Sequence, residues 1–390
     1  MTSSALRPGI IALCAAALCA IGALLPLWQS GEGVEQLLIP GSNAAATPII
    51  YQDFGHIVTH TELGHDGAMM YAIARDPLNF EASTPYLDRP QYRLQRPGLP
   101  WLSRVLHPHG TGRGLVWAMF AAQLVTVGAG AFGLARLIQR HGGNASLAIL
   151  YGLVPGVVLS QMMTLADGMA LSLALCAIAC ANEKRWYLAT AFGTVAALTK
   201  ESILLMLWAW ACAELWQRRW TVRTTAAFAL IPTAAIGAWI LYIKATVAPS
   251  SNEVIEFGWP FQGIYQAIAH YSGSDALSWF YFGLAALLAL AVASAQRRQP
   301  TEFTRSILCT IAVQAAFITL LAAPVVGEDQ NSSRILAPIM ALGLLGVATN
   351  RGTLATTQRN ATGSTSQSEQ TPQDPSSLRQ PALRRYRVAP

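Results

Sequence analysis

Residues 9–28, GIIALCAAALCAIGALLPLW, form a stretch of 20 residues without a charged side chain. A helix of this length rises about 30 Å, which matches the hydrocarbon thickness of a bilayer. The stretch follows a short arm that contains Arg7, so a cleaved signal peptide is one interpretation. Because further apolar runs follow, we interpret the stretch as an uncleaved first transmembrane helix.

The composition of the whole chain indicates the same class of protein. Charged residues make up 12% of the 390 residues, hydrophobic residues make up 53%, and the mean hydropathy is +0.37. Soluble domains contain about 25% charged residues, so this chain has too few to cover a soluble surface. We predict an all-α, polytopic transmembrane helix bundle of about ten spans within residues 1–349. Beyond the first run, the apolar runs lie at 115–138, 146–163, 164–181, 187–198, 203–216, 224–247, 276–295, 305–323 and 335–349.

Two of these runs, 187–198 and 203–216, are short for a bilayer. At 1.5 Å per residue each reaches only roughly 20 Å, so they form either one interrupted helix or a hairpin. Basic residues lie at both outer ends of the pair, within 184–185 and 218–223. Because basic loops stay in the cytoplasm, both ends belong on the same side, which predicts a hairpin with its tip at 199–202.

The distribution of basic residues also predicts the orientation. The chain has 26 Lys and Arg against 20 Asp and Glu, a net charge of +6, which we assign to cytoplasmic loops rather than to a nucleic-acid partner. We therefore predict a multi-pass protein of the cell membrane (inner or plasma) with both termini cytoplasmic and residues 29–114 exoplasmic. Residues 350–390, rich in Ser, Thr, Gln and Pro, are expected to form a disordered cytoplasmic tail.

The exoplasmic segment is expected to contain short helices that lie over the bundle at the membrane surface. Apolar residues recur at helical spacing in 67–76, and the Asp-Pro pair at 76–77 should end that helix. Residues 100–107 begin with Pro, which suits the first turn of a helix, and continue with apolar side chains. The two helices are therefore expected to form a lid.

Charged residues from four distant segments are predicted to meet on the exoplasmic side. They belong to the segment 29–114, to the turn at Asp167, to the hairpin tip 199–202 and to the turn at 328–334. Charged groups near the membrane are costly, and they mark functional sites by default. We therefore expect a site where these segments converge.

Three stretches resemble one known family. They are GHDGAMMYAIARDP (64–77), LDRPQYRLQRPGLPWLS (87–103) and LTKES (198–202), and they are similar to bacterial, mannosyltransferase-like members of the GT-C superfamily. Members of this superfamily are multi-spanning glycosyltransferases that use polyprenyl-phosphate-linked sugars. The resemblance implies inverting transfer of a sugar from such a lipid to a glycan, lipid or protein acceptor on the exoplasmic face. It also implies that an acidic residue of the first outer loop acts as a base or binds a metal.

Asp66 is the candidate general base. Glycosyl transfer needs a carboxylate that takes the proton of the acceptor hydroxyl. The neighbouring Gly67 would let a substrate approach the backbone. The alternative is that Asp66 caps the helix over 67–76, since Asp is common at that position.

Four basic residues are candidate ligands of the donor phosphate, because Arg and Lys bind phosphate oxygens well. For Arg93 and Arg96 the alternative is contact with lipid headgroups or a surface ion pair with Asp88. Lys200 lies at the hairpin tip, and Arg334 begins the last span, where it could instead be an interfacial anchor.

Three further residues are candidate substrate ligands: His65, Asp167 and Glu201. Asp167 resembles the acid that often occupies the corresponding outer turn in the GT-C superfamily, and its alternative role is to cap the fourth span. The alternative for Glu201 is that it neutralises the adjacent Lys200.

Two other classes of protein compete with the glycosyltransferase hypothesis. A transporter or flippase would have a site reachable from both sides of the membrane. A non-catalytic scaffold predicts that the side chains of Asp66, Lys200 and Arg334 do not converge.

No organic cofactor is implied, and no residue is assigned as a metal ligand. A divalent cation stays an open alternative, and the spacing of His56 and His60 is only a weak indication of a metal site.

Overall fold

The computed structural model describes residues 6–365, apart from residues 60, 109, 250–256 and 271–275. The chain divides into two compact units, Met1–Gly352 and Thr353–Pro390, and the fold and the site described below belong to the first. Most of the predicted tail, residues 366–390, lies outside the described residues, so its disorder stays a prediction.

Helices account for 79% of the structure, and the described residues contain no strand, which confirms the all-α prediction. In the part of the chain that the structure describes, five helices are long and apolar enough to cross a membrane, as expected of a membrane protein. These five are α1 (Pro8–Ser30), α7 (Gly112–Arg140), α12 (Val222–Thr246), α14 (Ala276–Arg298) and the part Asp329–Thr349 of α17 (Asp329–Thr365).

The other five predicted runs form shorter helical segments. Among the described residues, the pair η3 (Ala145–Leu153) and α8 (Pro155–Met162) is the one segment of this group that is long enough for a span. The helices therefore give five spans, or six if that pair counts as one span. The prediction of about ten spans is therefore not established by helix length. The shorter segments are η3 (Ala145–Leu153) with α8 (Pro155–Met162), α9 (Ala166–Asn182), α10 (Trp186–Thr199), α11 (Leu204–Trp216) and α15 (Glu302–Ile318).

The run predicted as one helix over 146–163 is bent by 47° between η3 and α8. Pro155 follows the bend, and it pushes Val154 out of the helical region to φ −60° and ψ 121°. Gly152 lies so close to α1 that a Cβ there would clash with the carbonyl group of Ala15. The proline thus interrupts the helix, and Gly152 allows η3 to pack closely against α1.

The short helices α10 and α11 form the predicted hairpin. The ring of Trp186, at the start of α10, lies 5.1 Å from the ring of Trp220, which follows the end of α11. One interrupted helix would place these rings far apart, because each residue adds 1.5 Å. The short helix η4 (Glu201–Ile203) forms the tip, and both arms pack against α12.

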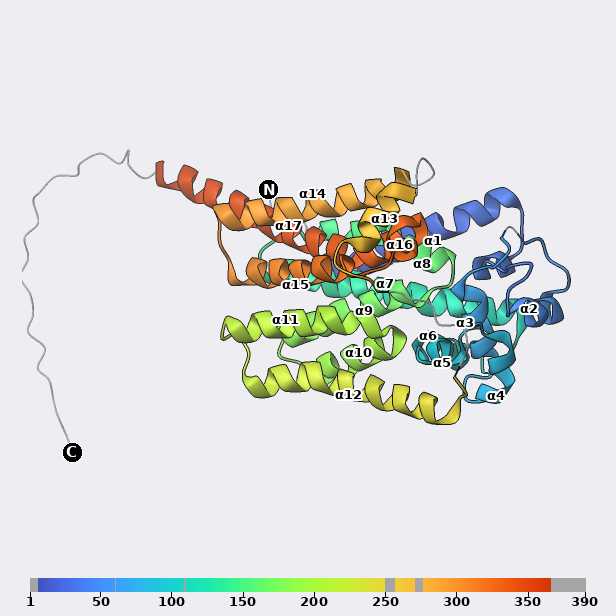
Figure 1. The fold of residues 1–390 in the computed structure, drawn as a ribbon. Helices are drawn as coiled ribbons and strands as arrows, with labels where there is room; N and C mark the ends of the chain where they lie inside the picture. Colours follow the sequence, from blue (N-terminus) through green and yellow to red (C-terminus); the bar gives the residue numbers. More distant parts are fainter. Residues whose placement is uncertain (1–5, 60, 109, 250–256, 271–275, 366–390) are drawn as a thin grey trace, which may run out of the picture. The chain divides into compact units, whose positions relative to one another are not determined.

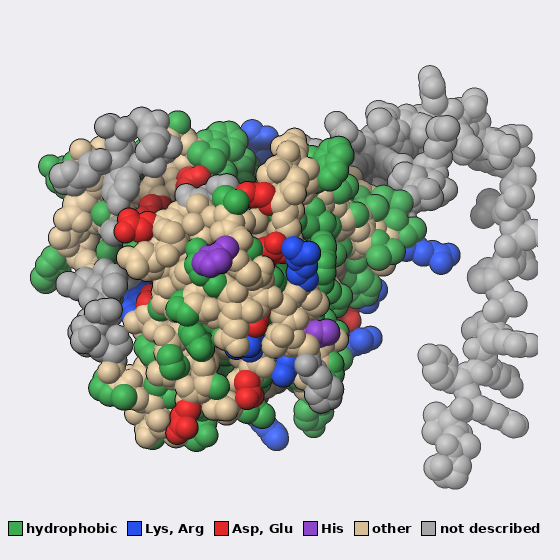
Figure 2. Space-filling model, turned by 90° about the vertical axis from the view of Figure 1, so that its right-hand side faces the viewer, with side chains coloured by type: hydrophobic (Ala, Val, Ile, Leu, Met, Phe, Trp, Pro, Cys, Tyr) green, Lys and Arg blue, Asp and Glu red, His purple; other side chains and the backbone are tan. Residues whose placement is uncertain are grey.

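The helices of residues 29–114 gather at one end of the long helices (Figure 1). Acidic, basic and histidine side chains are interspersed on this end (Figure 2). The helices are η1 (Val34–Leu38), α2 (Thr47–Phe54), α3 (Asp66–Arg75), α4 (Phe80–Ser83), η2 (Thr84–Tyr86), α5 (Pro90–Leu94) and α6 (Gly98–Leu106).

Both helices predicted in this segment are present, as α3 and α6, but α3 does not lie on the surface. Every residue from Gly67 to Ala74 is buried. Gly67 allows this burial because it has no side chain. It lies so close to the backbone at Met163 that an added Cβ would clash with the carbonyl oxygen of that residue. Protein backbone therefore occupies the space that we expected a substrate to use.

We expect Gly67→Ala to lower the free energy of unfolding by about 1–3 kcal/mol, because overpacking a rigid backbone contact forces the helix to shift. The control is Gly237→Ala in α12, where a Cβ has no neighbour within 4 Å. That change should stabilise the protein by about 0.5–1 kcal/mol, since Ala favours a helix over Gly. Thermal or chemical unfolding measures both, and equal effects would refute the close packing of α3.

Candidate functional site

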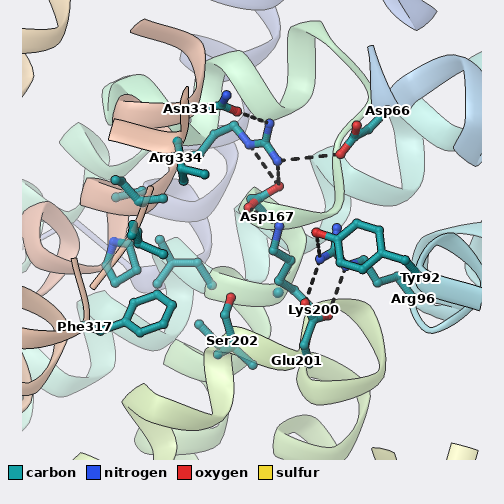
Figure 3. Close-up of a pocket in the computed structure, with 18 of the residues that line it drawn as sticks. Asp66, Tyr92, Arg96, Asp167, Lys200, Glu201, Ser202, Phe317, Asn331 and Arg334 are labelled. Carbon is teal, nitrogen blue, oxygen red and sulfur yellow. Dashed lines mark hydrogen bonds and ion pairs between the residues drawn. The ribbon is translucent and has the colours of Figure 1, made fainter. Parts of the chain in front are cut away.

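A cavity of about 320 Å³ lies where the predicted segments meet, within the lower range of ligand pockets, ~300–1,000 Å³. Figure 3 shows the labelled side chains around it. All eight predicted site residues line this cavity: His65, Asp66, Arg93, Arg96, Asp167, Lys200, Glu201 and Arg334. The predicted convergence is therefore present, whereas the chemical roles of these residues stay predictions.

Asp66 is the first residue of α3, and its carboxylate faces two arginines. Oδ1 lies 2.7 Å from Nη1 of Arg93, and Oδ2 lies 3.9 Å from Nη2 of Arg334. The N-cap residue of α3 is His65, and the helix has no side-chain cap hydrogen bond. The alternative role of Asp66 as a helix cap is therefore not realised, and 26% of its side chain stays exposed.

Arg93, which is only 6% exposed, connects two carboxylates. Its Nε and Nη2 donate to the two carboxylate oxygens of Asp88 at 2.8 and 2.9 Å, while Nη1 contacts Asp66. The pair with Asp88 agrees with one alternative from the sequence, but its arginine is buried, while the side chain of Asp88 is 35% exposed. Asp88 thus holds the guanidinium group in place beside Asp66.

Asp167 connects the hairpin tip to the last long helix. Its Oδ1 lies 3.1 Å from Nζ of Lys200, and its Oδ2 lies 2.9 Å from Nη2 of Arg334 (Figure 3). Asp167 is the second residue of α9, and that helix has no side-chain cap hydrogen bond, so the capping alternative is wrong here. Arg334 also donates to Asn331 at 3.1 Å.

Lys200 and Glu201 do not pair with each other, contrary to the alternative considered from the sequence. Glu201 accepts two hydrogen bonds from Arg96, at 3.0 and 2.6 Å, while Lys200 pairs with Asp167. Lys200 has extended backbone, φ −154° and ψ 117°, and side chains that follow each other in extended chain point to opposite sides. The tip therefore contacts two different parts of the site.

The cluster changes the proton affinity of Asp66. Burial would raise the pKa of its carboxyl group, but the surrounding positive charges outweigh burial and hold this pKa well below its ordinary value. In decreasing order of effect, the cations are Arg93, Arg334, Arg96 and Lys200. Burial lowers the pKa of the neighbouring His65, which therefore favours the neutral form.

The sequence analysis missed several residues of the cavity. Tyr92 is the clearest: its hydroxyl accepts a hydrogen bond from Arg96 at 2.6 Å, and the guanidinium groups of Arg89 and Arg96 lie 4.3 and 4.2 Å from its ring centre. The sequence signal for Tyr92 was its spacing from two arginines. Arg89 lies three residues before it and Arg96 four residues after it, as neighbours on one helix face do. Gln314 and Phe317 of α15 also line the cavity and gave no comparable signal.

The metal hypothesis gains no support from the described residues, in which no group of three or more His, Cys, Asp or Glu side chains could hold an ion. His60 lies outside them, and His56 contacts the ring of Tyr51.

Comparison with protein-family models, with curated proteins and with solved structures finds no match to this chain. The functional argument therefore depends on the geometry of the cavity.

Proposed function

We propose that this protein is a membrane glycosyltransferase with about ten spans, similar to the GT-C superfamily. It would transfer a sugar, with inversion, from a polyprenyl-phosphate donor to an acceptor on the exoplasmic side. One observation carries the proposal: a partly exposed carboxylate, Asp66, lies in a cavity beside Arg93, Arg334 and Lys200. A non-catalytic scaffold predicts no such convergence.

The two halves of the cavity suit an amphiphilic substrate. One wall carries the charged side chains, while the other is formed by apolar residues that include Phe317, Leu321 and Val325. Phe317 lies across the cavity from Tyr92 and Arg96 (Figure 3). A phosphate ester whose attached group has an apolar face would find both a cationic and an apolar surface here.

In the proposed reaction, the acceptor hydroxyl oxygen attacks the anomeric carbon while the bond from that carbon to the phosphate oxygen breaks. Asp66 takes the hydroxyl proton, and the bonding electrons leave with the phosphate. A single displacement inverts the anomeric centre. Lys200 and Arg334, 16% and 11% exposed, are the cations best placed to stabilise the departing phosphate.

Arg96 has a different role in this proposal. It is only 3% exposed, and Glu201 occupies one edge of its guanidinium group, where Nε and Nη2 both donate to the carboxylate. We therefore assign Arg96 and Glu201 to positioning of the hairpin tip, which places Lys200 in the cavity. The positive charge of Arg96 still acts on Asp66 through space.

The low pKa of Asp66 makes it a weak base in the empty site. A bound donor phosphate would neutralise Arg334 and Lys200, weaken their hold on the carboxylate and raise its pKa. The donor would thus activate the base that acts on the acceptor.

This coupling predicts two different pH profiles. The acid limb of kcat/KM for the donor, which reports the free enzyme, should lie below ~3.9, the ordinary pKa of Asp. The acid limb of kcat should lie at higher pH, because a protonated Asp66 cannot accept a proton and its pKa rises in the complex. Steady-state profiles above and below pH ~3.9 measure both limbs. Coincident limbs would contradict donor activation.

The function itself is tested with purified protein in nanodiscs and a labelled short-chain polyprenyl-phosphate hexose. A glycosyltransferase releases polyprenyl phosphate and moves the label to an added acceptor or to water. A transporter would leave the labelled lipid intact, and in liposomes it would move the lipid between leaflets. Intact lipid together with leaflet exchange would therefore replace the proposed function.

A further inference from the structure

Gln314 is a buried residue whose amide nitrogen, Nε2, lacks a hydrogen-bond partner. It belongs to α15, lines the cavity and is 5% exposed. Among the described residues, none accepts a hydrogen bond from its Nε2. A buried donor without a partner destabilises a folded protein, so such groups are rare and require an explanation.

The surroundings of Gln314 are apolar. Phe317 lies three residues further along α15 and therefore on the same helix face, and it also lines the cavity. The ring of Phe257 lies 6.0 Å from that of Phe317. Leu321 and Val325 continue this wall, so Gln314 and its neighbours here contribute no charged side chain.

We propose that Gln314 and Phe317 bind the sugar ring of the substrate and that this sugar is neutral. A pyranose has an apolar C–H face that packs on an aromatic ring, and hydroxyl groups that form hydrogen bonds with an amide. An isoprenoid chain would offer the amide of Gln314 no hydrogen bond. A uronic acid or amino sugar would place a charge against an uncharged wall, which is unfavourable.

This inference rests on the proposed function and deepens it, because it divides the cavity into a phosphate subsite and a sugar subsite. The phosphate subsite is formed by Lys200 and Arg334, and the sugar subsite by Gln314 and Phe317. The two can be tested separately, since a sugar-free polyprenyl phosphate occupies only the first.

The test compares two ligands in nanodiscs, a short-chain polyprenyl phosphate and the same lipid carrying a neutral hexose. The wild type should bind the hexose-bearing lipid more tightly. Gln314→Leu should weaken that binding about tenfold, which corresponds to ~1.4 kcal/mol, and leave binding of the sugar-free lipid unchanged. Gln314→Leu should also raise the thermal stability of the empty protein, because it removes an unpartnered buried amide nitrogen.

The matched control is Thr310→Val, one turn earlier on α15. Thr310 is fully buried, does not line the cavity, and donates to the carbonyl oxygen of Ser306 at 2.9 Å. Its replacement should lower stability and leave both affinities unchanged. A purely structural Gln314 would behave like Thr310.

Each remaining outcome decides between the hypotheses. Lower stability of Gln314→Leu with unchanged affinities would overturn the sugar subsite and leave the phosphate subsite standing. Equal binding of both lipids by the wild type would likewise overturn the sugar subsite and leave the phosphate subsite standing. Tighter binding of a uronic-acid lipid than of the hexose lipid would overturn the neutral-sugar assignment. A wild type that binds neither lipid would overturn the proposed function itself.

Discussion

Asp66→Asn should lower kcat for sugar transfer by ~10²–10⁴-fold, the usual contribution of a general base. Asn keeps the shape of the side chain but cannot accept the proton of the acceptor. The affinity for the donor should not fall, because Arg93 keeps Asp88 as its partner and Arg334 keeps Asp167. Initial rates with the labelled donor, together with the donor affinity of each variant, separate the two effects.

The matched control for this variant is Asp76→Asn, at the other end of α3. Asp76 is exposed and does not line the cavity. Its replacement removes one negative charge from the same helix and should change kcat by no more than about twofold, as is usual for surface positions. Turnover at the wild-type level in Asp66→Asn would show that Asp66 is not the base.

Glu201→Gln should lower the free energy of unfolding by about 3–5 kcal/mol, because it leaves a buried arginine without its carboxylate. Arg96 is 3% exposed, and of the contacts described above it would keep those with the hydroxyl and the ring of Tyr92, which carry no charge. The double variant Arg96→Met/Glu201→Leu should be less destabilised than Glu201→Gln, since apolar residues often replace a buried ion pair at little cost. Thermal or denaturant unfolding of the protein in detergent gives both values.

The control here is Glu183, whose two partners, Arg136 and Arg185, are 45% and 62% exposed, in contrast to Arg96. Glu183→Gln should lower the free energy of unfolding by at most ~1 kcal/mol, because the arginines that lose their partner are exposed to water and salt. If Glu183→Gln and Glu201→Gln destabilise the protein equally, the contact between Arg96 and Glu201 is not a buried structural pair.

Much of the fold could be predicted because its signals are local. Each of the ten apolar runs found in the sequence contains a helical segment, and two of these segments form the hairpin of α10 and α11. The bend at Pro155 was missed because the hydropathy of a run does not show whether a proline within it interrupts the helix. The burial of α3 was also missed, since it depends on the contact between Gly67 and Met163.

The sequence by itself determined that the protein is an all-helical, apolar bundle and which eight charged or polar residues were candidates for one site. These properties follow from composition and from residues close together along the chain. Only the tertiary structure decided which partner each charge has. Arg96 pairs with a residue 105 positions away, and Arg334 pairs with one 167 positions away. Such pairs depend on how distant helices pack, and so does the unpartnered amide nitrogen of Gln314, because no local pattern specifies which side chains will share a cavity.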